Sequence, residues 1–124
     1  MGRTKRFGIA LKRVYDEPCE TDGLRILVER LWPRGLSKDR ASLHHWLKET
    51  APSPELRRWY AHRPERWAEF QARYRAELDA NAEVVRALRA LCDAEPVTFV
   101  FAARDTERNS AAALKRYLYE DFAD

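Results

Sequence analysis

The sequence predicts a single α/β domain with a small, mostly parallel sheet flanked by helices. Two segments near the N-terminus alternate between apolar and polar residues as strands do, and amphipathic helices occupy the middle of the chain. Residues 97–103 are almost entirely apolar, β-branched or aromatic, which is typical of a strand covered on both faces in a parallel sheet. The 124 residues suit one compact domain spanning 1–124, and we expect residues 1–6 to form a flexible basic N-terminus.

The first two predicted strands span residues 7–14 and 24–31. In the second, Leu24, Ile26 and Val28 alternate with Arg25 and Glu29, as in a strand, and we expect this strand to be buried. This strand should stop at the turn formed by residues 32–35, because its proline removes a ladder donor and its glycine permits a sharp turn.

Helices are predicted over most of residues 53–92. Ser53 can cap the first helix, with Pro54 at its first position. Pro64 begins the next, which carries an apolar stripe on one face. We expect Asn81 to interrupt this helix before a further helical segment that ends at about Cys92.

Two local predictions leave alternatives open. Residues 43–48 fit either a short strand or one helical turn. The last helix can be capped by Asp105 or by Thr106, because both residue types accept hydrogen bonds from free N–H groups at a helix start.

The charge balance indicates two kinds of partner. The chain has 23 Lys and Arg against 20 Asp and Glu, a net charge of +3, and the positive excess lies within residues 1–40. A basic region attracts either an anionic small molecule or nucleic acid. GC-rich coding, which favours arginine, would produce the same excess without any partner.

The sequence indicates a cytoplasmic protein. It contains no apolar run of the roughly 18 residues that a membrane span requires, so we expect no membrane partner. The N-terminus leads into a mixed segment rather than the apolar core of a secretory signal. Cys19 and Cys92 belong to no CxxC pattern and are expected to be free thiols.

The candidate site follows the second predicted strand, in a loop rich in arginine that also contains a tryptophan. A guanidinium can hold a phosphate or carboxylate through two parallel hydrogen bonds, and an indole offers a flat surface for stacking. Ligands of parallel sheets bind beyond the carboxyl ends of the strands, where we expect several such ends to converge. The candidate ligand-binding residues are Arg13, Arg30, Trp32, Arg34, Gly35, Lys48, Arg57, Asp105 and Asn109.

Within this predicted cleft, the arginines would clamp the anion, and Asp105 and Asn109 would orient the rest of the ligand. Glu29 and Asp105 are the candidate internal partners that would offset the positive charge. The alternative is that the arginines form buried salt bridges and that Trp32 is an ordinary core residue.

No cofactor or metal is expected, because the sequence lacks HExxH, a His/Cys cluster, GxGxxG and a P-loop. The sequence indicates no particular reaction, catalytic residue or oligomeric state. Two other functions remain open, namely a regulatory or adaptor protein without catalysis and a nucleic-acid-associated protein. The residues that would contact nucleic-acid phosphates are Arg3, Lys5, Arg6, Lys38 and Arg40.

Residues 24–35, with the Asp22-Gly23 pair before them, resemble the D-G-x-R-x-L-V-D-R-L-W-P-R-G signature of the YeaO-like proteins, a family of unknown function. Residues 46–53 are similar to that family's W-L-K-x-x-A-P-S segment, and residues 55–62 to its E-L-R-x-W-x-x-H segment. The resemblance covers residues 9 to about 118. It implies a bacterial or archaeal cytosolic protein of about this size and no established reaction.

The sequence departs from the YeaO-like pattern at two positions. Glu29 stands where the family usually has Asp, which is a longer carboxylate of the same charge. Arg108 stands where the family often has His before the Asn, here Asn109, so any chemistry of that histidine is missing from this position.

Overall fold

Four parallel strands form the sheet, in the order β1-β4-β2-β3. A computed structural model describes residues 8–122, and the predicted flexible segment 1–6 and Phe7 lie outside the described residues. The predicted α/β class is confirmed, with a sheet that is parallel throughout. The strands are β1 (Ile9–Arg13), β2 (Leu24–Leu27), β3 (His45–Trp46) and β4 (Val97–Phe101).

β4 lies between β1 and β2, and its Val97 is opposite both Ile9 and Leu24. All five residues of β4 are buried, as the apolar run at 97–103 predicts. β2 is shorter than the predicted strand at 24–31. The backbone ladder stops because the Ala102 N–H, just beyond β4, donates to the Glu29 side chain instead of to a strand carbonyl.

Five α-helices and three short 3-10 helices lie among residues 8–122. Of the two alternatives for residues 43–48, the short strand is confirmed as β3, and a 3-10 turn begins only at Lys48. The interruption predicted at Asn81 is confirmed, since it separates α3 from α4. The helices are α1 (Lys38–Ala41), α2 (Pro54–Tyr60), α3 (Trp67–Asp79), α4 (Ala82–Ala94) and α5 (Ser110–Phe122), with 3-10 turns at Glu20–Asp22, Lys48–Thr50 and Pro64–Arg66.

Ser53 caps α2 as predicted, accepting a hydrogen bond from the Leu56 N–H at 3.1 Å. The Glu77 carboxylate of α3 in turn accepts from the Ser53 N–H at 2.9 Å and from its hydroxyl at 2.6 Å. These two hydrogen bonds fix the start of α2 against α3.

The predicted cap of the last helix is wrong. α5 begins at Ser110, and its cap is Asn109, whose Oδ1 accepts from the Ala112 N–H at 2.8 Å. Asp105 instead caps a separate turn before the helix, because its carboxylate accepts from the N–H groups of Glu107 and Arg108.

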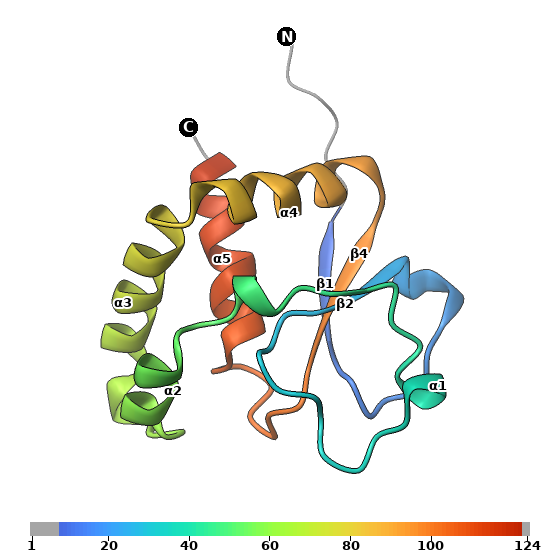
Figure 1. Ribbon diagram of the computed structural model, residues 1–124, viewed down its shortest axis with the longest axis horizontal. Coiled ribbons are helices and arrows are strands. Elements are labelled where there is room, and N and C mark those ends of the chain that lie inside the picture. The colour runs from blue at the N-terminus through green and yellow to red at the C-terminus, as the bar shows by residue number, and fades with distance from the viewer. Residues whose placement is uncertain (1–7, 123–124) are drawn as a thin grey trace, which may run out of the picture.

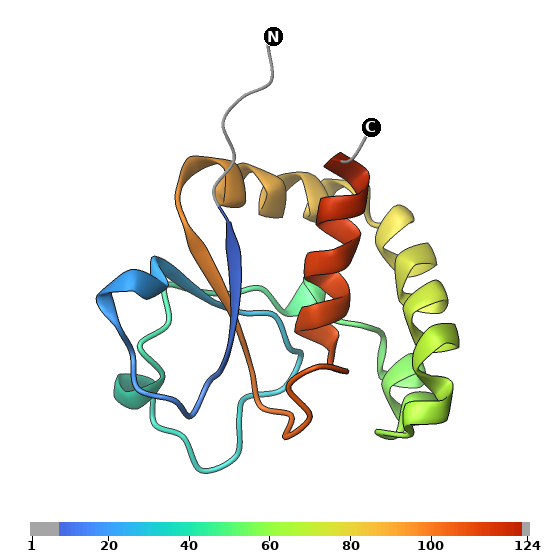
Figure 2. The same ribbon diagram turned by 180° about the vertical axis from the view of Figure 1, so that it is seen from behind.

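The two faces of the sheet are covered differently (Figure 1). One face, which includes Ile26 and Phe99, packs against α2, α3, α4 and α5. The other, which includes Leu27 and Val100, is covered by the loop that follows β2 and by Ala41 of α1. Figure 2 shows the same division from behind, with α3 and α5 on one side of the strands and α1 on the other.

Arg25, in β2, is one of the buried charged residues of the fold. Its side chain is only 2% exposed and forms an ion pair with Asp22 at 2.9 Å. Its Nε also donates to the Ala41 carbonyl at 3.0 Å. A buried guanidinium is tolerated here because a carboxylate and backbone carbonyls surround it.

Candidate functional site

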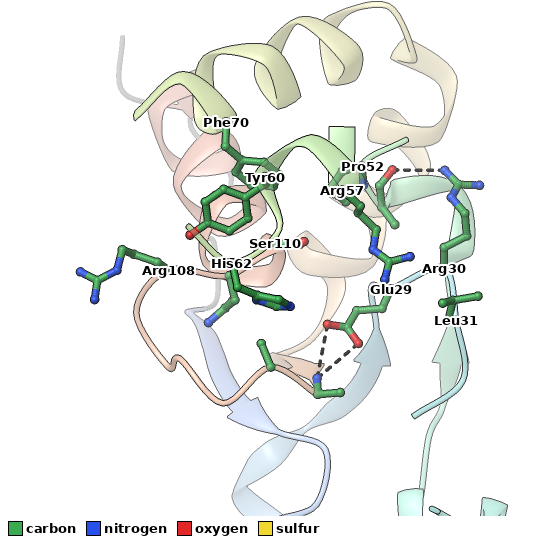
Figure 3. Close-up of a pocket in the computed structure, with 14 residues that line it drawn as sticks. Glu29, Arg30, Leu31, Pro52, Arg57, Tyr60, His62, Phe70, Arg108 and Ser110 are labelled. Carbon is green, nitrogen blue, oxygen red and sulfur yellow. Dashed lines mark hydrogen bonds between the residues drawn. The ribbon is translucent and has the colours of Figure 1, made fainter. Parts of the chain in front are cut away.

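A cavity of about 280 Å³ lies beyond the carboxyl ends of β2 and β4, where it is bounded by α2, α3 and the start of α5 (Figure 3). This is the edge at which parallel sheets bind ligands. Pockets for drug-sized ligands begin at about 300 Å³, so this one suits a small molecule. It is lined by Glu29, Arg30, Leu31, Ala51, Pro52, Arg57, Tyr60, His62, Phe70, Ala102, Ala103, Arg108, Asn109 and Ser110.

Two arginines with unused hydrogen-bonding capacity line the cavity. Arg30, which follows β2, donates from Nη2 to the Ala51 carbonyl at 3.3 Å, but its buried Nε has no hydrogen-bond partner among residues 8–122. The side chain of Arg57, on α2, forms no hydrogen bond or ion pair within the described part of the chain. A buried donor left without a partner costs about 1–3 kcal/mol, so the arrangement favours an additional acceptor from outside the protein.

The start of α5 adds positive potential at the same edge. The first N–H groups of a helix lack intrahelical acceptors and carry a partial positive charge. Arg108, just before this helix, is the third guanidinium on the cavity lining, and its Nε donates to Asp105 at 3.1 Å. Figure 3 shows the Arg108 guanidinium pointing away from Arg30 and Arg57, so it lies at the rim.

The Glu29 carboxylate also lines the cavity and lies beside the Arg57 side chain (Figure 3). Its two oxygens accept from the Ala102 N–H at 3.2 and 3.3 Å. Burial raises the pKa of Glu29, and the Ala102 hydrogen bond and the charge of Arg57 offset this effect only in part. The ionised form of Glu29 is therefore incompletely compensated by the protein.

The raised pKa of Glu29 gives a prediction for stability. Between the ordinary value of 4.5 and the raised pKa, the folded protein binds more protons than the unfolded chain, so stability falls as the pH rises through this interval. Glu29→Gln, which can keep the Ala102 hydrogen bond, should raise the Tm at pH 7 and change it little well below pH 4.5.

Thermal unfolding at both pH values checks this expectation. Glu95→Gln is the matched control, because it removes the same charge from an exposed position. A lower Tm for Glu29→Gln than for this control at pH 7 would show that the ionised carboxylate stabilises the unliganded fold.

Of the residues predicted from the sequence, the structure brings Arg30, Arg57 and Asn109 to the cavity. Asn109 is buried and its amide is already used, since Nδ2 donates to the Asp105 carbonyl at 2.9 Å and Oδ1 caps α5. Asp105 does not line the cavity. The N–H groups that it caps are the main reason why its pKa is lowered.

Arg13 does not line the cavity but binds backbone carbonyls of two residues that do. From the end of β1, its Nε donates to the Ala103 carbonyl at 3.0 Å and its Nη2 to the Ala102 carbonyl at 2.8 Å. These bonds hold the loop after β4, which forms part of the cavity wall.

Trp32 and Lys48 lie away from the cavity, around Trp46. The two indoles meet edge to face with their centroids 5.3 Å apart, and the Trp32 Nε1 donates to the Leu36 carbonyl at 2.6 Å. The Lys48 ammonium lies 4.3 Å from the centroid of the Trp46 ring. Trp32 packs against the sheet face opposite α2–α5, so no tryptophan lines the cavity.

Arg34 and Gly35 lie in an exposed turn outside the cavity. The Arg34 carbonyl accepts a hydrogen bond from the Tyr15 hydroxyl at 2.9 Å. Gly35 has a φ of 73°, a left-handed conformation that glycine adopts without strain.

Glu29 was considered only as an internal charge partner, and sequence reasoning missed Tyr60, His62 and Ser110 as cavity residues. Tyr60 ends α2, and its ring lies 6.3 Å from that of His62. The signal available was the segment 55–62, whose motif carries both Arg57 and His62.

The residues predicted to contact nucleic acid fall into two groups. Arg3, Lys5 and Arg6 lie outside the described residues, whereas Lys38 and Arg40 are exposed on α1, away from the cavity. Over residues 8–122, no cluster of three or more metal-ligating side chains is present. None of the helices in that range is both long and apolar enough to cross a membrane.

A model of the protein family described as the inactive DUF488-N3 subclade matches residues 8–124. The chain belongs to this family. The resemblance of the sequence to YeaO-like proteins is confirmed, since it is 39% identical to the uncharacterised protein YeaO of Escherichia coli over 89% of this chain and 96% of YeaO. Uncharacterised proteins of Mycobacterium tuberculosis and Mycobacterium bovis are each 44% identical, over 89% of this chain and 92% of theirs. No solved structure matches the chain.

In this YeaO-like protein, both departures from the family pattern lie at the cavity. Glu29 and Arg108 are lining residues. The residues of the signature lie in two places. Arg30 and Leu31 line the cavity, whereas Trp32 packs on the other face of the sheet.

Proposed function

We propose that this YeaO-like protein binds a small molecule bearing a phosphate or carboxylate group in the cavity beyond β2 and β4. The observation that supports it is the pair Arg30 and Arg57, which face one cavity with donors that the protein leaves unused. With Glu29 ionised, the three groups carry a net positive charge, and the start of α5 adds to it. An anion would receive charge-assisted hydrogen bonds from both guanidiniums.

Binding without catalysis is the better-supported role. The matching family is described as inactive, and its curated relatives are uncharacterised. The cavity lining contains no cysteine, and the two cysteines lie elsewhere as free thiols, Cys19 exposed and Cys92 buried. Free thiols of this kind also support a cytoplasmic location, where cysteines stay reduced.

Anion-dependent stabilisation tests the proposal. Phosphate, sulfate and small carboxylates should raise the Tm of the wild-type protein as their concentration rises, because they bind the native state alone. Arg57→Ala should weaken binding by about tenfold or more, the effect of losing a hydrogen bond to a charged group. Affinity is measured by calorimetry or by the concentration dependence of Tm.

Arg58→Ala is the matched control. Arg58 is the next residue on α2, is also exposed and does not line the cavity, so its replacement changes helix propensity and net charge equally. It should leave anion affinity unchanged. Equal affinities for the two variants would contradict the proposed site, and stabilisation by short duplex DNA but by none of the small anions would favour the nucleic-acid function instead.

A further inference from the structure

The Glu29 carboxylate has unused capacity to accept hydrogen bonds. An ionised carboxylate offers about four acceptor sites. Among residues 8–122, one donor, the Ala102 N–H, serves both Glu29 oxygens, at 3.2 and 3.3 Å. Glu29 has no ion pair within the described residues, although Arg57 is close enough to influence it.

Glu29 lines the same cavity as Arg30 and Arg57. Figure 3 shows its carboxylate beside Arg57, whereas the Arg30 guanidinium lies next to the Ala51 carbonyl. A ligand with only an anionic group would bring a second negative charge close to Glu29, which disfavours binding. A ligand that also carries a positively charged donor would avoid this repulsion. It would supply the hydrogen bonds that Glu29 lacks.

The charges of the site also favour one anion over another. Arg30 and Arg57 together carry two positive charges, and Glu29 carries one negative charge. The three groups carry a net charge of +1, which a simple carboxylate would already neutralise. Once a positive group on the ligand balances Glu29, however, a phosphate monoester, which carries about −1.5 to −2 at pH 7, matches the two guanidiniums better than a carboxylate does. An ammonium group on the same ligand would balance Glu29.

We propose that the ligand of this cavity is a small phosphorylated amine, with its phosphate on Arg30 and Arg57 and its ammonium group donating to Glu29. This inference rests on the proposed anion-binding function and adds the second recognition point. The modest cavity volume of about 280 Å³ suits a compact molecule of this class.

A pair of ligands that differ in one group tests the inference. Phosphoethanolamine and ethyl phosphate share the phosphate ester and differ in the terminal ammonium. Calorimetric titration of the wild-type protein should show about tenfold or greater preference for phosphoethanolamine, the effect of one charge-assisted hydrogen bond. Glu29→Gln should lose this preference while still binding ethyl phosphate at least as tightly as the wild type.

A conservative variant separates a charge requirement from structural damage. Glu29→Asp keeps the negative charge and should retain a preference for phosphoethanolamine. If Glu29→Gln does not fold, the ligand pair on the wild type and on Glu29→Asp still decides the question.

The possible failures point to different conclusions. Equal affinity of the two compounds for the wild type, or a preference that persists in folded Glu29→Gln, would overturn the inference while leaving anion binding intact. Binding of neither compound, together with no stabilisation by phosphate, sulfate or carboxylates, would overturn the proposed function itself.

Discussion

Replacing Asp22 with alanine is expected to lower the free energy of unfolding by about 3–5 kcal/mol, because it leaves the buried guanidinium of Arg25 without its counter-charge. The Asp22 carboxylate accepts hydrogen bonds from Arg25 at 2.9 Å, from Lys12 at 3.1 Å and from the Cys19 N–H at 3.0 Å. The Arg25 side chain is 2% exposed and that of Asp22 is 8% exposed, so water cannot replace the lost partner.

The same network makes stability depend on pH. Burial alone would raise the pKa of Asp22, but the Cys19 N–H, Lys12 and Arg25 together outweigh it, and the pKa is lowered below the ordinary value of 3.8. The stability that Asp22 contributes is therefore fully present above pH 3.8 and is lost as the pH falls through the lowered pKa. Asp22→Ala should accordingly be much less stable than the wild type at pH 7 and approach it in strong acid.

Urea unfolding at neutral and acidic pH measures both effects. Asp16→Ala, an exposed carboxylate in the loop after β1, is the control for loss of one negative charge. Combining Asp22→Ala with Arg25→Met should recover part of the loss, because the double variant has no unpaired buried charge. A loss below about 1 kcal/mol for Asp22→Ala would mean that Arg25 finds other compensation.

The second large effect is expected at Gly23, where alanine should destabilise the fold by about 3 kcal/mol or more. Gly23 has φ 64° and ψ −138°, a conformation essentially restricted to glycine and costing about 1–3 kcal/mol for other residues. A Cβ there would lie 2.2 Å from the Pro96 carbonyl oxygen, which also accepts the Leu24 N–H at 3.0 Å. The clash therefore falls on the backbone that aligns β2 with β4.

Gly35→Ala separates conformational strain from the clash. Gly35 also has a positive φ, 73°, but a Cβ there would meet no heavy atom within 4 Å. It should lose only the strain energy of a left-handed residue, about 1–2 kcal/mol. Chemical denaturation of the two variants compares them directly, and equal losses would show that the Gly23 backbone moves away from Pro96 without cost.

The sequence predicted the elements of the fold better than the surroundings of single charged residues. Ser53 and Pro54 mark the start of α2 through local capping chemistry, which acts over a few residues and can be recognised in the sequence. Arg25 could not be assigned to the interior in the same way. Its burial depends on Asp22, on the Val14 and Ala41 carbonyls and thus on segments that only the fold brings together.

For the candidate site, the sequence predicted the edge of the sheet but only part of the lining. Arg30 and Arg57 reach the cavity, whereas Trp32, only two residues after Arg30, packs against the opposite face of the sheet. Consecutive loop residues carry no periodicity that would reveal this reversal. Tyr60 and His62 reach the cavity through the turn that ends α2, which a helix pattern does not describe.

The position of β4 in the sheet has a consequence for how the protein is made. β4 is the last strand to be synthesised, yet it lies between β1 and β2, which come first. Until residues 97–101 leave the ribosome, the only strands of this sheet that can pair are β2 and β3, which share a short register. β1 and β2 therefore cannot pair with β4 until residues 97–101 are available, so we expect the sheet to form late and its apolar strands to be clients of chaperones before then.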